Sequence, residues 1–141
     1  MSFEIALQRM PHRGEMLLIE TVLEADEDSI RCQAKPHQTP HYPLRVDDKL
    51  PATALVELGA QAAAAHASLH GVGAAHVGLL LTLSGVEIGT ISPDAAPDGL
   101  HIYAWREHGD KRSARYRFEV QTMYAETLLS GNAVLSMAAT T

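Results

Sequence analysis

Apolar residues fill almost every position between Leu50 and Gly71 (LPATALVELGAQAAAAHASLHG). The segment opens with Pro51, which a helix accepts in its first turn because the amide groups there have no internal partner. It closes at Gly71, a residue suited to the left-handed conformation that ends many helices. Because Ala52–Ala65 is apolar almost all round, we expect a long helix that the rest of the chain encloses.

Four segments before this helix have patterns of their own. Residues Phe3–Met10 carry apolar positions at helical spacing, which predicts a brief leading helix. Residues Met16–Glu24 are apolar and β-branched, and Ser29–Lys35 alternates between apolar and polar positions, so the two predict a β-hairpin across the charged cluster between them. The segment Pro36–Lys49 has several prolines and no period, which predicts a loop.

The second half of the chain alternates between apolar and polar positions. Three or four strands are predicted there, at about residues 76–90, 99–108, 112–123 and 126–138, with turn residues between them. One long helix followed by such a meander predicts an α+β fold, in which a curved antiparallel sheet wraps around the helix. A sheet of this kind leaves an edge strand, and pairing across a homodimer would cover it.

Composition and charge restrict the function classes. With 141 residues, 46% of them apolar, the chain fits a single domain over residues 1–141 with a sizeable core. A net charge of −6 argues against nucleic acid as a partner, because phosphate binding needs a basic surface. We also expect no membrane partner and a cytoplasmic location, because no apolar run reaches membrane length and the lone Cys32 cannot form an internal disulfide.

Three polar residues interrupt the apolar helix before its histidines. Thr53, Glu57 and Gln61 are four residues apart, so they share one face. A buried carboxylate is costly unless it is paired, protonated or used. Two interpretations of Glu57 are open: it reaches a solvated edge or a structural hydrogen bond, or it is an acid used in chemistry. We favour the second.

A histidine near the helix start would complement such an acid. His41 precedes the helix by about nine residues. A neutral imidazole is a natural proton acceptor, as a carboxyl of raised pKa is a natural donor. The helix start at Ala52 adds backbone N–H groups and a positive dipole end that suit an oxyanion. Alone, His41 fits a solvated loop residue better than a base, and it is the pairing with Glu57 that favours a role in chemistry. His37 is the second candidate because it lies further from the helix.

Other reactive side chains fit structural roles better. His66 and His70 have a spacing that can bind zinc, but no acidic residue or cysteine supports a metal site, so we predict none. Cys32 alternates inward on its strand and fits a core residue. A group of basic residues fits either a solvated strand face or a dock for an acidic partner: Arg45, Lys49, Lys111, Arg112, Arg115 and Arg117.

Several of these motifs together resemble one enzyme family. They are PHR (11–13) followed by MLLI (16–19), HYP (41–43), LPA (50–52) and VELGAQ (56–61). The combination is similar to the FabA/FabZ family of 3-hydroxyacyl-(acyl-carrier-protein) dehydratases, whose motifs include His-Phe-Pro and a helix with Glu four residues before Gln. The variants of aryl-polyene biosynthesis are the closest likeness. Ala52 and Leu44 stand where that family has glycines, and the loop before Pro51 is about two residues longer.

The resemblance implies a hotdog fold and a dehydration that needs no cofactor. By this resemblance, His41 removes the C2 proton of a 3-hydroxyacyl chain on an acyl carrier protein, while a backbone N–H at Ala52 holds the enolate oxygen. Glu57, from the other subunit of a homodimer or of a heterodimer with another hotdog subunit, protonates the departing hydroxyl, and Gln61 orients it. Two alternatives stay open: a hotdog acyl-thioester hydrolase, and a non-catalytic acyl-binding subunit.

Overall fold

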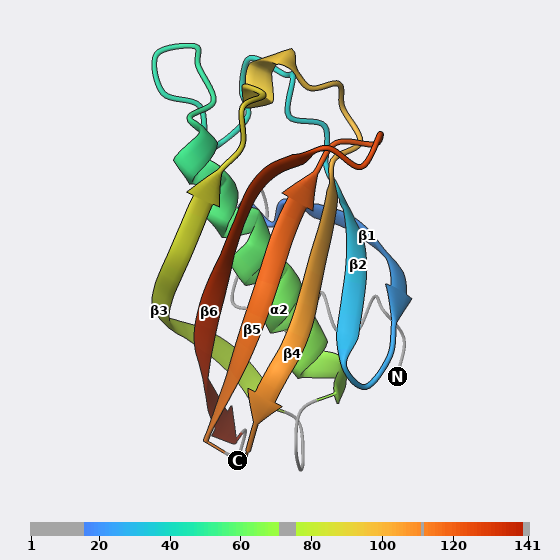
Figure 1. Cartoon of the computed structure of the whole chain (residues 1–141), viewed down its shortest axis with the longest axis vertical. Helices are drawn as coiled ribbons and strands as arrows, with labels where there is room; N and C mark the ends of the chain where they lie inside the picture. The colour runs from blue at the N-terminus through green and yellow to red at the C-terminus, as the bar shows by residue number, and fades with distance from the viewer. Residues whose placement is uncertain (1–15, 71–75, 111, 140–141) are drawn as a thin grey trace.

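The structure is a computed structural model that describes residues 16–70, 76–110 and 112–139 (Figure 1). The leading helix predicted at Phe3–Met10, the PHR motif and Lys111 lie outside the described residues. In chain order the elements are β1 (Ile19–Ala25), β2 (Ser29–Ala34), the 3₁₀ turn η2 (Ala52–Leu55), α2 (Val56–His70), β3 (His76–Ile88), the 3₁₀ turn η3 (Pro93–Ala95), β4 (His101–Gly109), β5 (Ser113–Gln121) and β6 (Thr127–Ala139).

The strands form one antiparallel sheet in the order β1-β2-β4-β5-β6-β3, with β1 and β3 at its edges. The sheet curves around α2, which runs along its inner face (Figure 1). The predicted α+β architecture, the central helix and the strands of the second half are confirmed, with boundaries shifted by a few residues. No helix in these described parts is long and apolar enough to cross a membrane.

Alternation along the strands builds the core. On β5, Ala114, Tyr116, Phe118 and Val120 are buried against the helix, and the residues between them lie on the outer face. Helix α2 is buried on all sides from Leu58 to Ser68, which confirms the enclosed helix that its composition predicts.

Close packing fixes how deep the helix lies. A side chain on Gly59 would overlap the ring of Phe118, and one on Gly131 of β6 would crowd the same ring from the sheet. Only glycine at these two positions lets the helix backbone lie directly on the aromatic ring. This contact seats the N-terminal half of α2, next to Glu57.

The predicted loop before the helix contains a tight turn that its sequence pattern does not indicate. Val46 and Lys49 exchange two backbone hydrogen bonds, at 2.7 and 3.0 Å, across Asp47 and Asp48. These two residues have φ values of 50° and 62°, as a two-residue type I′ turn requires. The chain then enters η2 through Pro51, so the first turn of the helical segment is a tight 3₁₀ turn.

Candidate active site

Gln61 anchors the polar face of the helix to the start of the sheet. Its amide oxygen accepts the backbone N–H of Leu18 at 2.8 Å, and its amide nitrogen donates to the carbonyl of Met16 at 2.6 Å. The same nitrogen donates to the Glu57 carboxylate at 3.2 Å. Gln61 is fully buried and Glu57 is half-buried. The amide therefore fixes both the helix and the carboxylate against the segment that leads into β1.

His41 lies on the surface, in the loop that leads to the helix. Its side chain is exposed and lines two hollows, one of about 270 Å³ that also contains Leu18 and Tyr42, and a polar one next to Arg45. An exposed imidazole in a hollow can meet a ligand or another subunit. The position suits a proton acceptor better than a buried one would.

Within one chain, His41 and Glu57 are both linked to Leu18, just before β1, but they do not line a common hollow. Leu18 lines the smaller hollow of His41 and donates its N–H to Gln61, which in turn holds Glu57. Glu57 is not among the residues that line either hollow of His41. The two groups are thus placed near the same end of the helix, and the sequence expectation that they meet across two subunits stays a prediction.

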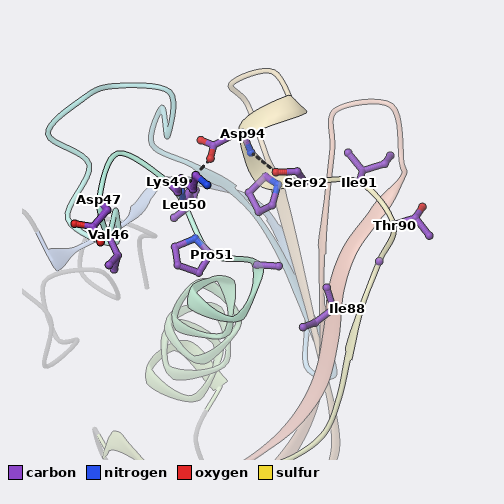
Figure 2. A pocket seen from close by; sticks show the side chains of 13 residues that line it. Val46, Asp47, Lys49, Leu50, Pro51, Ile88, Thr90, Ile91, Ser92 and Asp94 are labelled. Carbon is purple, nitrogen blue, oxygen red and sulfur yellow. Dashed lines mark hydrogen bonds between the residues drawn. The ribbon is translucent and has the colours of Figure 1, made fainter.

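The start of the helix opens into a third hollow, of about 630 Å³ (Figure 2). Leu50, Pro51 and Ala52 form its helix side, and the segment between β3 and η3 forms the opposite wall. The backbone N–H groups of a helical first turn have no partner within the helix and carry its positive dipole end. The predicted oxyanion position at Ala52 therefore borders a space large enough for a ligand.

The second candidate base, His37, is buried in the same loop. It is 0% exposed, its Nε2 donates to the carbonyl of Pro93 at 2.9 Å, and Asp98 accepts its backbone N–H at 2.9 Å. These contacts tie the loop to the segment around η3. Burial and these hydrogen bonds give His37 a structural role, and the choice of His41 as the base stays a prediction.

Arg45, predicted as a docking residue, is used inside the chain. Its guanidinium donates to three backbone carbonyls and to Asp94, and its side chain is 10% exposed. Asp94 also accepts the backbone N–H of Leu50 at 3.0 Å, directly before the helix. This N–H and Arg45 hold the pKa of the Asp94 carboxyl below its usual value. Sequence reasoning missed Asp94, because no pattern links it to a loop 44 residues away.

The remaining basic residues do not form one patch with the loop in this chain. Lys49 is exposed beside the helix start, whereas Arg112 and Arg115 are exposed at the β4–β5 hairpin, at the opposite end of the sheet (Figure 1). Arg115 also lies 3.5 Å from the Glu107 carboxylate.

His66, at the far end of the helix, is structural. His66 is 0% exposed, its Nε2 donates to the carbonyl of Asp26 at 2.8 Å and its Nδ1 accepts the Tyr116 hydroxyl at 2.6 Å. Across the part of the chain that the structure describes, no group of three or more potential metal-ligating side chains is present. Cys32 is buried, as predicted, and burial raises the pKa of its thiol to about 12.

Comparison with protein families supports the resemblance that the motifs indicate. The model of a family described as ApeP-like, ApeP dehydratase, matches residues 5–138. A comparison with curated proteins found no match to this sequence.

Solved structures with the same fold include both dehydratases and thioesterases. The dehydratase heterocomplex ApeI:P from Xenorhabdus doucetiae is similar with a TM-score of 0.79 at 21% identity, over 95% of this chain and 91% of that one. The thioesterase HI1161 from Haemophilus influenzae has a TM-score of 0.66 at 13% identity, over 84% of this chain and 77% of that one. A hypothetical thioesterase with coenzyme A from Streptococcus pneumoniae TIGR4 has a TM-score of 0.65 at 9% identity, over 97% and 94%. The predicted hotdog fold is confirmed.

Proposed function

Because the chain belongs to the ApeP-like dehydratase family, we propose that it dehydrates a 3-hydroxyacyl thioester, carried on an acyl carrier protein, to a trans-2-enoyl thioester in fatty-acid-like or polyene biosynthesis. The observation that carries the proposal is the hydrogen bond from Gln61 to Glu57, on the helix face that is anchored to the segment before β1. It supports a carboxyl held in one orientation near the helix start, as a proton donor needs.

In this proposal each polar group has one task. His41 accepts the C2 proton, whose acidity comes from the thioester carbonyl, and the electron pair moves to the thioester oxygen. The Ala52 backbone N–H stabilises that oxyanion. The C3–O bond then breaks, and Glu57 in its protonated form gives the proton that turns the departing hydroxyl into water. Gln61 orients Glu57, and no cofactor is required.

We also propose that the working unit is a dimer of hotdog subunits, of this chain with itself or with a second hotdog subunit. Strand β3 supports this, because it is an edge strand with Val86 and Ile88 40% and 53% exposed. The name of the ApeI:P heterocomplex describes an assembly of two subunits in a relative. In such a dimer His41 of one subunit serves with Glu57 of the other.

Activity measurements with two variants test the proposal. Glu57→Gln and His41→Ala are each expected to lower enoyl thioester formation by about 10²- to 10⁴-fold, because each removes one proton-transfer group. Thermal unfolding of both should match the wild type. The matched controls are Glu20→Gln and His108→Ala, at exposed positions outside the site, which should keep full activity.

The same assay separates the alternatives. Wild-type turnover in both site variants would refute the assignment of the residues. Release of free thiol without enoyl product would favour a hydrolase, and binding of the hydroxyacyl thioester without either product would favour a non-catalytic subunit. For docking of the carrier two separate surfaces are candidates, Lys49 beside the helix start and the β4–β5 hairpin with Arg112 and Arg115, next to Lys111 in sequence. Replacement of the residues on the surface that is used should raise KM for carrier-bound substrate.

Mixing the two inactive variants tests the assembly. A mixed dimer of His41→Ala and Glu57→Gln chains contains one site with both residues intact. Random exchange of subunits should therefore restore about a quarter of the wild-type activity if the site combines two copies of this chain. No recovery would place both residues in one chain, or assign the second one to a different partner subunit.

A further inference from the structure

One guanidinium ties together the loop that carries His41. Arg45 donates from Nε to the carbonyl of Thr39 at 3.0 Å and from Nη2 to the carbonyl of His37 at 2.9 Å. Its Nη1 donates to the carbonyl of Asp48 at 3.2 Å, in the type I′ turn. The backbone on both sides of His41 is thus held by one planar group whose geometry is fixed.

A carboxylate connects that guanidinium to the start of the helix. Asp94 Oδ1 accepts from Arg45 Nη1 at 2.7 Å, and its Oδ2 accepts the backbone N–H of Leu50 at 3.0 Å. Its own N–H donates to the Ser92 hydroxyl at 3.3 Å, which fixes the carboxylate on η3 (Figure 2). Leu50 is two residues before Ala52, so the carboxylate spans the loop and the proposed oxyanion position.

Local backbone bonds pass this restraint on to His41. The Tyr42 N–H donates to the Thr39 carbonyl at 3.2 Å, and the Arg45 N–H donates to the Tyr42 carbonyl at 3.0 Å. His41 therefore lies inside a tight turn that Arg45 holds at both ends, at Thr39 through the guanidinium and at Tyr42 through the Arg45 backbone N–H. Moving Arg45 would shift the imidazole relative to the helix start.

We propose that Arg45 and Asp94 form a positioning pair that holds the His41 loop in a fixed position relative to the helix start. The inference rests on the proposed function and deepens it, because it names two residues that act through His41 and Ala52. It also replaces the docking role expected for Arg45. A charge-assisted hydrogen bond suits such a restraint, because it is shorter and stronger than one between neutral groups, and the Arg45 side chain that donates it is only 10% exposed.

The test compares kinetics on two substrates, a carrier-bound 3-hydroxyacyl thioester and the same acyl group on pantetheine alone. Arg45→Met and Asp94→Asn are expected to lower kcat by about 10- to 100-fold on both substrates, because a small misplacement of a catalytic group has effects of this size. KM should change little. Arg45→Lys, which keeps a charge but not the planar fork, should fall between Met and the wild type.

Matched controls come from a second ion pair of similar length. Arg31 Nη2 and Glu24 Oε1 lie 2.9 Å apart beside the β1–β2 turn, at the opposite end of the sheet from the loop. Arg31→Met and Glu24→Gln remove an ion pair without touching the His41 loop, so kcat should stay at the wild-type value. A loss of kcat in these controls as large as that in Arg45→Met would overturn the proposal.

Three further results would overturn it. A higher KM for the carrier-bound substrate alone, with normal kcat on the pantetheine thioester, would make Arg45 a docking residue. A lower Tm with unchanged kcat would make the pair purely structural. In the double variant, the two residues acting as a pair should cost no more than the worse single variant, whereas losses that multiply would separate them.

A measurement without substrate keeps this proposal distinct from the proposed function. Amide hydrogen exchange over residues 37–50 should speed up at least tenfold in Arg45→Met and stay unchanged in Arg31→Met. Unchanged exchange in Arg45→Met would overturn the positioning pair even if His41→Ala and Glu57→Gln lose activity. Conversely, wild-type activity in those two variants would refute the proposed function even if the loop amides exchange faster.

Discussion

The two ends of the central helix use histidine and arginine in opposite ways. At the C-terminal end, His66 is buried between the Tyr116 hydroxyl and the Asp26 carbonyl. Arg106 donates there to the carbonyls of His70 and Glu27, each at 2.7 Å, and so joins the helix end to the β1–β2 turn. At the N-terminal end, the Arg45 guanidinium also binds carbonyls, but one of the two histidines of its loop, His41, is exposed.

The difference shows how one side-chain type is kept structural or left available for chemistry. Burial lowers the pKa of His66 to about 4, so its ring is neutral at physiological pH. The Asp26 carbonyl can only accept, so Nε2 carries the proton and Nδ1 has to accept from Tyr116. A protonated ring would put a donor against that hydroxyl. His41 has no such burial, and its loop is fixed through the backbone.

The largest effect on stability is expected from acid at the C-terminal end. In the unfolded chain His66 binds a proton near its ordinary pKa of 6.5, and in the folded chain only near 4. Stability from this group is complete above pH 6.5 and is lost as the pH falls toward 4. The loss is on the order of 3 kcal/mol, and urea unfolding at several pH values measures it.

His66→Gln is the matched variant, because an amide can still donate to Asp26 and accept from Tyr116 without binding a proton. The difference in unfolding free energy between this variant and the wild type should shrink as the pH falls from 6.5 to 4. A difference that does not depend on pH would contradict the structural assignment of His66. The carboxylates other than Asp26, which interacts with His66, are common to both proteins and cancel in the comparison.

A smaller effect on stability is expected at Gly59, where the helix packs directly on the Phe118 ring. Gly59→Ala adds a methyl group that overlaps the Phe118 ring and should destabilise the fold by about 1–3 kcal/mol, as overpacking of cores does. Phe118→Leu in the same chain makes room for the methyl group, so the double variant should lose less than the sum of the two single losses. Additive losses in thermal unfolding would show that the two residues do not share this contact.

Most of the fold could be predicted from the sequence because its elements are long and regular. The all-apolar helix around Leu58 and the alternation from Ala114 to Val120 leave few other arrangements. The order of the strands in the sheet could not be predicted from these patterns, because a pattern along one strand does not show which other strand pairs with it. The type I′ turn at Asp47 and Asp48 was also missed, since it lacks the glycine that normally marks such turns.

The candidate site could be predicted only in part. Glu57 and Gln61 were found because a polar residue stands out in an apolar helix, and the contact between them is present in the structure. Arg45 was assigned to docking because a charge on a loop gives no sign of what it contacts. Its partner Asp94 follows Pro93 in a different loop, and only the folded chain brings that carboxylate to the helix start.

The smallest expected effect on stability comes from replacing an aspartate by glycine in the turn at each end of the helix. Asp48→Gly relieves a left-handed residue (φ 62°) in the turn near the helix start, and should stabilise the fold by up to about 1 kcal/mol. Asp28→Gly, in the β1–β2 turn at the other end, should destabilise it by a similar amount, because Asp28 is not among the positive-φ residues and glycine only adds freedom to the unfolded chain. Thermal unfolding should therefore shift in opposite directions for the two variants. A shift in the same direction would mean that the turn before the helix is not held in the left-handed conformation on which the Arg45 contacts to Asp48 depend.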